Sequence, residues 1–145
     1  MSKVIEICIT KNSGNKMHNV SMIEVVESKG IINDRYFSEN QNFDTQITLI
    51  ESENIDNYNN LKKTKIPYID FRRNIVTNGL ILNDLINKEL LIGDAIIKVH
   101  RLCHPCKYLQ EKLKQSNFIK EFLHKGGLRC EILTDGKINV VDIIK

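Results

Sequence analysis

The chain has 145 residues, a length that fits one folded domain, and a net charge of +3. Hydrophobic residues make up 41% and charged residues 27% of it, a composition that excludes a disordered chain. No apolar run approaches the roughly 18 residues of a membrane helix, and the N-terminus lacks the apolar core of a signal peptide. The charge is too small to indicate nucleic-acid binding. We therefore predict a single domain over residues 1–145, located in the cytoplasm, with its four cysteines reduced.

The first third of the chain is predicted to begin with a β-hairpin. Strand-forming residues fill positions 4–10 and 18–28, and a turn rich in Asn, Ser and Gly at 11–17 separates them. A short strand is expected at 46–50. Apolar residues then recur at a spacing of three, which predicts a helix over 51–63.

The remainder of the chain continues this mainly-β pattern. A short helix is expected at 80–86, a strand at 95–101, and an amphipathic helix from the cysteines that follow to about residue 124. Two strands, 129–133 and 137–144, flank an Asp-Gly pair, which is a strong hairpin signal. Many strands with few short helices predict a mainly-β domain that is curved or closed like a barrel.

Two cysteines lie where this strand ends and the helix begins. Cys103 and Cys106 flank His104 and a proline, and cationic Arg101 and Lys107 lie beside them. The first N–H groups of a helix are unpaired and carry partial positive charge. A thiol placed there is shifted toward thiolate, the form that attacks electrophiles and binds metal. We therefore expect a lowered pKa at Cys106.

Three other interpretations of the cysteines stay open. Buried cysteines often act as small hydrophobic residues, and we expect this of Cys8 and Cys130, which lie in apolar runs. A zinc site would need a second pair of ligands, and the sequence has no second Cys-x-x-Cys and no His-x-x-x-His outside the cysteine stretch. A thiol–disulfide redox protein would use Cys103 and Cys106 as a couple, but the pair lies two-thirds along a β-rich chain rather than early.

Two adjacent arginines lie in a segment of strand formers at 69–77. Arg72 and Arg73 are either a solvated strand edge with one salt bridge or an anion clamp, because the guanidinium fork matches oxyanions. Alternate residues of a strand face opposite sides. We therefore expect Arg73 to converge with Arg129 on the cavity that Cys106 faces, and Arg72 to point away.

Several blocks of sequence together resemble one family. Residues 30–36 read Gly-Ile-Ile-Asn-Asp-Arg-Tyr, and 46–53 read Gln-Ile-Thr-Leu followed by a glutamate. Residues 71–93 begin Phe-Arg-Arg-Asn-Ile, 102–109 contain Cys-His-Pro-Cys, and 124–129 read His-Lys-Gly-Gly-Leu-Arg. In this order, from about Val20 to Ile144, they resemble the MOSC domain, named for the C-terminal domain of molybdenum cofactor sulfurases.

The resemblance implies a β-rich, barrel-like fold and a role with the molybdenum cofactor. It matches Cys106 to a family cysteine proposed as a molybdenum ligand or as a carrier of persulfide sulfur, with Cys103 as its neighbour in the motif. The cofactor's pterin carries a phosphate, for which the cations of these blocks are suited. The implied cofactor-binding residues are Arg73, Asn74, His104, Lys125 and Arg129, with Arg72 as a further cation.

The sequence also departs from the family pattern. Asn33 replaces a glycine, Tyr36 replaces a histidine, and Val141 precedes the aspartate of a usual Gly-Asp turn. We expect no aminotransferase-like domain of the kind that full sulfurases carry, and no lysine in these residues has a recognisable pyridoxal phosphate context. Expected partners are the cofactor and the enzymes that make or receive it. A non-catalytic module that delivers the cofactor is the remaining alternative.

Overall fold

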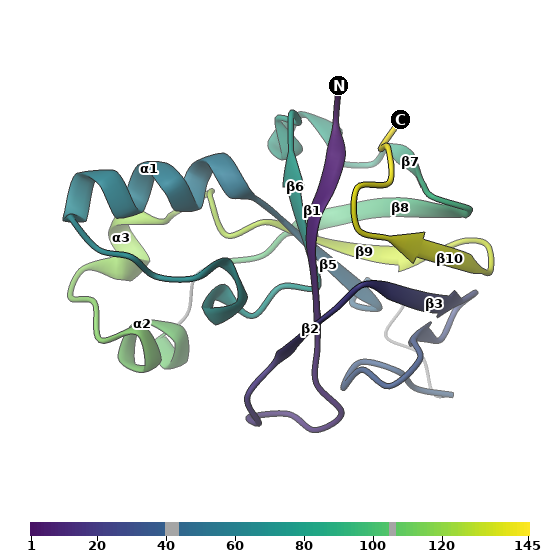
Figure 1. Ribbon diagram of the computed structural model, residues 1–145, viewed down its shortest axis with the longest axis horizontal. Helices are drawn as coiled ribbons and strands as arrows, with labels where there is room; N and C mark the ends of the chain where they lie inside the picture. Colours follow the sequence, from purple (N-terminus) through teal and green to yellow (C-terminus); the bar gives the residue numbers. More distant parts are fainter. Residues whose placement is uncertain (40–43, 105–106) are drawn as a thin grey trace.

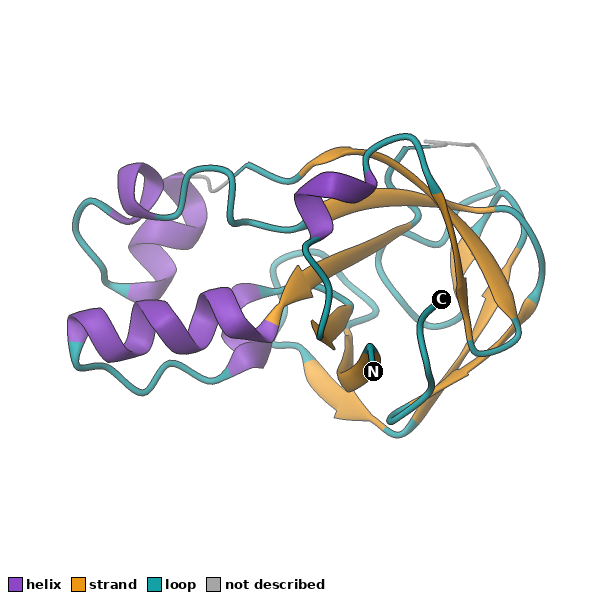
Figure 2. Cartoon of the chain, turned by 90° about the horizontal axis from the view of Figure 1, so that it is seen from above, coloured by secondary structure: helices purple, strands orange, loops and turns teal. Residues whose placement is uncertain are grey.

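The computed structural model describes residues 1–39, 44–104 and 107–145. Within these ranges the strands form two sheets, and the larger one curls into a half-barrel (Figure 1; Figure 2). The larger sheet has the order β2-β1-β6-β5-β9-β8-β7, formed by β2 (His18–Val20), β1 (Lys3–Ile9), β6 (Ile75–Asn78), β5 (Ile47–Glu51), β9 (Leu128–Ile132), β8 (Ala95–Leu102) and β7 (Glu89–Ile92). The smaller sheet has the order β10-β3-β4, formed by β10 (Gly136–Asn139), β3 (Met22–Val26) and β4 (Gly30–Ile31).

The longer helices gather at one end of the larger sheet (Figure 1). The helical elements are α1 (Ser52–Lys62), α2 (Lys107–Leu113), α3 (Phe118–Glu121) and the 3-10 helices η1 (Tyr68–Phe71) and η2 (Leu82–Leu85). None of the helices in the described ranges is long and apolar enough to cross a membrane.

Two buried clusters stabilise this arrangement. The larger one lies among the strands, where alternate residues of β8 and β9 are buried and those between them are partly exposed. The smaller one lies under the helices and contains four aromatic rings, of which Phe118 and Phe122 stack with centroids 5.1 Å apart. Tyr58 meets both edge-on. Because β5 contributes Leu49 to one cluster and Ile50 to the other, both of its faces are buried.

The expected mainly-β, barrel-like fold is confirmed, and so is the opening hairpin, since β1 and β2 pair antiparallel. The single strand expected at 18–28 is instead two strands separated by Ser21. β2 pairs with β1 in the larger sheet, whereas β3 pairs with β10 in the smaller one. The chain changes sheet at Ser21, whose carbonyl accepts a hydrogen bond from the backbone N–H of Val140 at 3.0 Å.

The hairpin predicted around Asp135-Gly136 is wrong. β9 pairs with β5 and β8, whereas β10 pairs with β3, so the Asp-Gly pair connects two sheets. The carboxylate of Asp135 accepts the backbone N–H of Glu27 at 2.7 Å, which holds the crossing against the end of β3. Asp-Gly therefore supplies a tight change of direction here without joining neighbouring strands.

Three other predicted elements are shorter than expected. The helix expected to reach residue 124 is divided into α2 and α3, because Lys114 and Asn117 have φ values of 56° and 61° between them. The segment 69–77 begins in η1 and enters β6 only at Ile75. The final strand ends at Asn139, and Val141 then adopts a φ of 70°, an unusual conformation for a β-branched residue.

Gly127 is predicted to be the glycine least tolerant of a side chain. Its φ is 96°, and a Cβ there would lie 1.9 Å from the carbonyl oxygen of Leu49 in β5. Gly14 has a similar φ of 83° with open space around it, so a substitution there measures only the cost of placing a side chain on a left-handed backbone. We expect Gly14→Ala to lower the free energy of unfolding by about 1–2 kcal/mol and Gly127→Ala by about 3 kcal/mol or more. Equal losses in urea denaturation would show that β9 does not approach β5 this closely.

Candidate functional site

A cavity of about 260 Å³ collects most of the cations that the sequence singles out. We call it the arginine pocket, after Arg35, Arg72, Arg73 and Arg129 in its lining. Its other lining residues are Ser13, Gly14, Tyr36, His104, Tyr108 and Leu109. None of the described residues that line it is acidic. The pocket is therefore built to attract an anion.

The pocket is assembled from segments that are far apart in the sequence. The loop between β1 and β2, the turn after β4, the link from η1 to β6, β9 and α2 all contribute to its walls. Arg129 is partly exposed between the buried Leu128 and Cys130, as strand alternation requires for a side chain facing away from the main core. Sheet curvature and loop packing, rather than any single motif, thus create the site.

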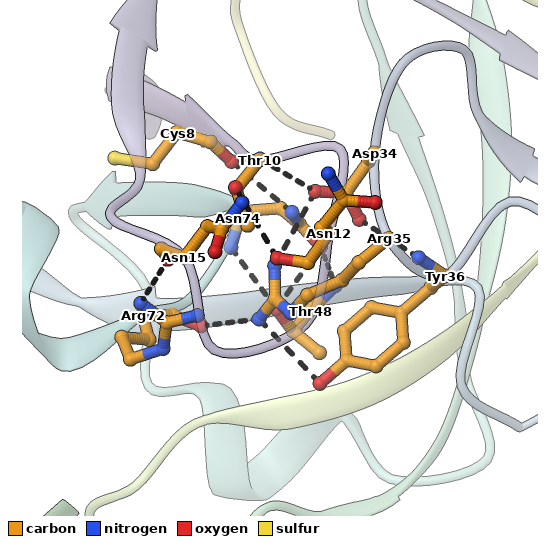
Figure 3. Close-up of polar contacts among 10 residues, drawn as sticks. All are labelled: Cys8, Thr10, Asn12, Asn15, Asp34, Arg35, Tyr36, Thr48, Arg72 and Asn74. Carbon is orange, nitrogen blue, oxygen red and sulfur yellow. Dashed lines mark hydrogen bonds and ion pairs between the residues drawn. The ribbon is translucent and has the colours of Figure 1, made fainter.

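The turn after β4 fixes Arg35 in the pocket wall (Figure 3). Asp34 is buried, accepts the backbone N–H of Thr10 at 3.2 Å and pairs with Nη1 of Arg35 at 3.3 Å. The other terminal nitrogen of Arg35 donates to the carbonyl of Arg72 at 3.0 Å. The guanidinium lies 4.3 Å from the centre of the Tyr36 ring, which is cation–π geometry.

This geometry explains two of the departures from the family pattern. Asn33 has a φ of 73°, a conformation that glycine adopts freely and that asparagine tolerates better than most residues. The substitution therefore keeps the turn that presents Asp34 and Arg35. Tyr36 replaces histidine with a ring on which the Arg35 guanidinium rests. Arg35 was not among the residues proposed from the sequence, although the Asp-Arg pair of that block was its signal.

The prediction that Arg72 points away from Arg73 is wrong. Arg72 follows η1 with a φ of 61°, so it lies in no strand and the alternation rule does not apply. Its side chain lines the arginine pocket together with Arg73. Nη1 of Arg72 donates to the carbonyl of Asn15 at 2.8 Å, which ties the guanidinium to the loop between β1 and β2 (Figure 3).

Neutral oxygen atoms hold the other arginines. Nε of Arg73 donates to the carbonyl of Gly126 at 2.8 Å, and Nη1 of Arg129 donates to the hydroxyl of Thr45 at 3.1 Å. Nε of Arg129 is buried and has no hydrogen-bond partner within the described part of the chain. These bonds orient the guanidinium groups without neutralising their charge. An anion in the pocket would meet oriented donors, one of them otherwise unsatisfied.

Asn74 lies beside Arg73 in the sequence but has a different place in the structure. It is fully buried; its side-chain oxygen accepts the N–H and the hydroxyl of Thr48 at 3.0 and 3.1 Å, and its side-chain nitrogen donates to the carbonyl of Cys8 at 3.1 Å. The side chain thus connects β1, β5 and the start of β6 (Figure 3). Asn74 does not line the pocket, so any effect on a ligand would act through its neighbour Arg73.

The remaining predicted residues are placed differently from one another. His104 lines the arginine pocket, whereas Lys125 lines a separate cavity with Tyr58 and Glu121. Cys103 follows β8 directly, is 2% exposed and donates its backbone N–H to Gly127 at 2.7 Å. Cys106, the predicted ligand or sulfur carrier, lies outside the described residues, as does Pro105. Its lowered pKa stays a prediction.

The two cysteines expected in the core are buried there. Burial, reinforced by the charge of Glu6, raises the pKa of the Cys8 thiol from 9.0 to about 12, although a hydrogen bond from Asn19 acts in the opposite direction. Burial also raises the pKa of Cys130. Neutral, enclosed thiols are poor nucleophiles, so these two behave as small hydrophobic residues.

The buried Cys8 thiol predicts a stability change at alkaline pH. The unfolded chain releases this proton near pH 9, whereas the folded protein retains it to about pH 12. The favourable contribution to folding is therefore complete below about pH 9 and falls as the pH rises from there toward 12. We expect Cys8→Ala to lose less stability than the wild type between these pH values. Parallel pH dependences of the unfolding free energy in the two proteins would contradict this.

Comparison with known proteins gives a family and a fold. The family model described as the MOSC domain matches residues 17–145. The crystal structure of the YuaD protein from Bacillus subtilis has a TM-score of 0.85 at 17% identity, covering 99% of this chain and 94% of that one. YiiM from Geobacillus stearothermophilus has a TM-score of 0.81 at 17% identity, covering 99% of this chain and 74% of that one. No curated protein matches in sequence.

Proposed function

Because this chain belongs to the MOSC domain family, we propose that it binds the molybdenum cofactor and holds the cofactor's phosphate in the arginine pocket. The observation that carries the proposal is the convergence of four guanidinium groups on a cavity without a described acidic wall. Arginine forks match the oxygen atoms of phosphate, and such charge-assisted bonds are the strong ones.

Two features of the pocket support a phosphate as its ligand. The buried Nε of Arg129 has no partner among the described residues, and a phosphate oxygen is the acceptor it lacks. Arg72 and Arg73, which follow η1, line the same pocket. His104, which lies within the cysteine motif in the sequence, adds a further hydrogen-bonding group to the lining. Phosphate binding at these residues would orient the cofactor relative to that motif.

The thiol of Cys106 is proposed as the soft ligand of the metal or as the carrier of a persulfide sulfur. The described residues contain no cluster of three or more His, Cys, Asp or Glu side chains that could hold a metal. In this proposal the metal comes with the cofactor, and the chain adds a thiolate, which suits a metal–sulfur centre. When bound, the cofactor supplies molybdenum for oxygen- or sulfur-transfer chemistry.

The redox interpretation requires Cys103 to form and break a disulfide with Cys106. Cys103 is buried, with 2% of its surface exposed, so a partner protein has little access to it. This burial favours the cofactor interpretation, in which Cys103 need not react. A module that only delivers the cofactor would use the same pocket. It would differ from a catalytic protein in that it transfers neither sulfur nor oxygen itself.

Expression in a host that makes the cofactor tests the proposal. We expect purified protein to contain molybdenum and phosphorylated pterin, and Arg129→Gln to retain about tenfold less of both, since one charge-assisted bond contributes about 1.5–3 kcal/mol. Cys106→Ser should lose molybdenum or transferable sulfur, and Cys103→Ser should lose less. Elemental analysis, pterin fluorescence and persulfide labelling measure these three quantities.

Lys125→Gln is the matched control, because it removes one cation that lies outside the arginine pocket. It should retain the pterin content of the wild type. Equal losses in Lys125→Gln and Arg129→Gln would show that binding depends on overall charge rather than on the pocket. Wild-type protein without pterin or molybdenum would contradict the proposed function.

A further inference from the structure

A second cavity, of about 340 Å³, adjoins the arginine pocket. Arg72 lines both cavities and so forms part of the wall between them. We call the second cavity the lysine pocket; it is lined by Lys16, Met17, Ile69, Asp70, Arg72, Lys112 and Leu113. The loop between β1 and β2, η1 and α2 supply these residues, and none of them except Arg72 reaches the arginine pocket.

We propose that the lysine pocket binds an organic carboxylate with an apolar body, as a ligand separate from the one in the arginine pocket. Three of its described lining residues are cationic and one, Asp70, is anionic, so the cavity favours a negative group. Its other three lining residues are apolar. This combination suits neither a bare inorganic ion nor an uncharged hydrocarbon.

Arg72 is the fixed cation of the lysine pocket. It is 8% exposed, and its backbone N–H donates to Ile69 at 3.0 Å while its carbonyl accepts Arg35. Its Nη1 donates a hydrogen bond to the carbonyl of Asn15, which is a neutral group, so the positive charge of the guanidinium is retained. A guanidinium that is largely removed from water and already oriented binds a carboxylate more strongly than a mobile surface lysine does.

The apolar wall is continuous with the interior of the protein. Met17 is 4% exposed, and Leu113 packs against the aromatic cluster under the helices. Ile69 lies in η1 between Asp70 and Tyr68, and Tyr68 packs against the same aromatic cluster. An aromatic or aliphatic body placed here would exchange water for a largely preformed apolar surface, and methionine adapts readily to its shape.

The charge and the body of the ligand can be tested separately. Benzoate carries both features, acetate carries only the charge, and benzyl alcohol carries only the ring. We expect calorimetric or NMR titration to show that benzoate binds at least about tenfold more tightly than either, since each of the two features adds to its affinity. The proposal would be contradicted if either acetate or benzyl alcohol bound as tightly as benzoate.

Matched lysine variants then locate the ligand. Lys112 lies on α2 with an exposed side chain, so Lys112→Gln is expected to fold normally. It should weaken benzoate binding about fivefold, whereas Lys125→Gln, which changes the same charge outside both pockets, should leave it unchanged. Equal effects of the two variants would overturn the assignment to the lysine pocket.

Inorganic phosphate distinguishes this inference from the proposed function. Arg129→Gln should weaken phosphate binding and not benzoate binding, because Arg129 lines only the arginine pocket. Lys112→Gln should weaken benzoate binding more than phosphate binding, because Lys112 lines the lysine pocket and contacts the arginine pocket only through its hydrogen bond to Tyr108. Benzoate binding without phosphate binding would retain the lysine pocket and reject the proposed use of the arginine pocket. If each variant weakens both ligands equally, the two cavities are one site and the inference is overturned.

Discussion

The hydrogen bonds of the buried Asn74 side chain are the constraint on which the site depends. They join the carbonyl of Cys8 in β1 to Thr48 in β5, at the residue directly before β6. The backbone carbonyl of Asn74 also accepts the N–H of Cys8 at 2.8 Å. Because Arg72 and Arg73 precede this fixed point, their place relative to the curled sheet is set by it. A buried amide with both ends satisfied is well suited to such a role.

Charge retained beside neutral partners is the second feature that gives the site its character. Arg72, Arg73 and Arg129 are oriented by carbonyl or hydroxyl oxygens, whereas Arg35 pairs with Asp34. Salt bridges to carboxylates would have oriented them equally well and would have cancelled their charge. The observed partners leave a cluster of oriented cations whose charge an anion can meet.

The sequence predicted the kind of fold and pointed to several side chains that lie close together in the structure. Strand alternation and turn residues were sufficient for the mainly-β architecture, and the family resemblance indicated Arg73, His104 and Arg129, which the structure brings to one pocket. Prediction from the sequence failed where tertiary packing decides which strands pair. Asp135-Gly136 has the composition of a hairpin but connects two sheets.

The same explanation applies to the side chains that lie elsewhere than the sequence indicates. Arg72 was placed by strand alternation, yet η1 and a left-handed backbone turn its side chain into the pocket. Lys125 shares a sequence block with Arg129, but the chain between them carries the two side chains to different cavities. Short 3-10 turns and positive φ values depend on contacts from distant segments, and local residue patterns do not encode them.

The most direct measurement of the central claim is the NMR response of arginine Nε–H groups to inorganic phosphate. Nε of Arg129 is buried without a described partner, whereas Nε of Arg101 already donates to Asp44 at 2.8 Å. If the arginine pocket binds phosphate, the Arg129 resonance shifts in a saturable manner and the Arg101 resonance does not. An unchanged Arg129 resonance, or equal shifts at both residues, would contradict the account.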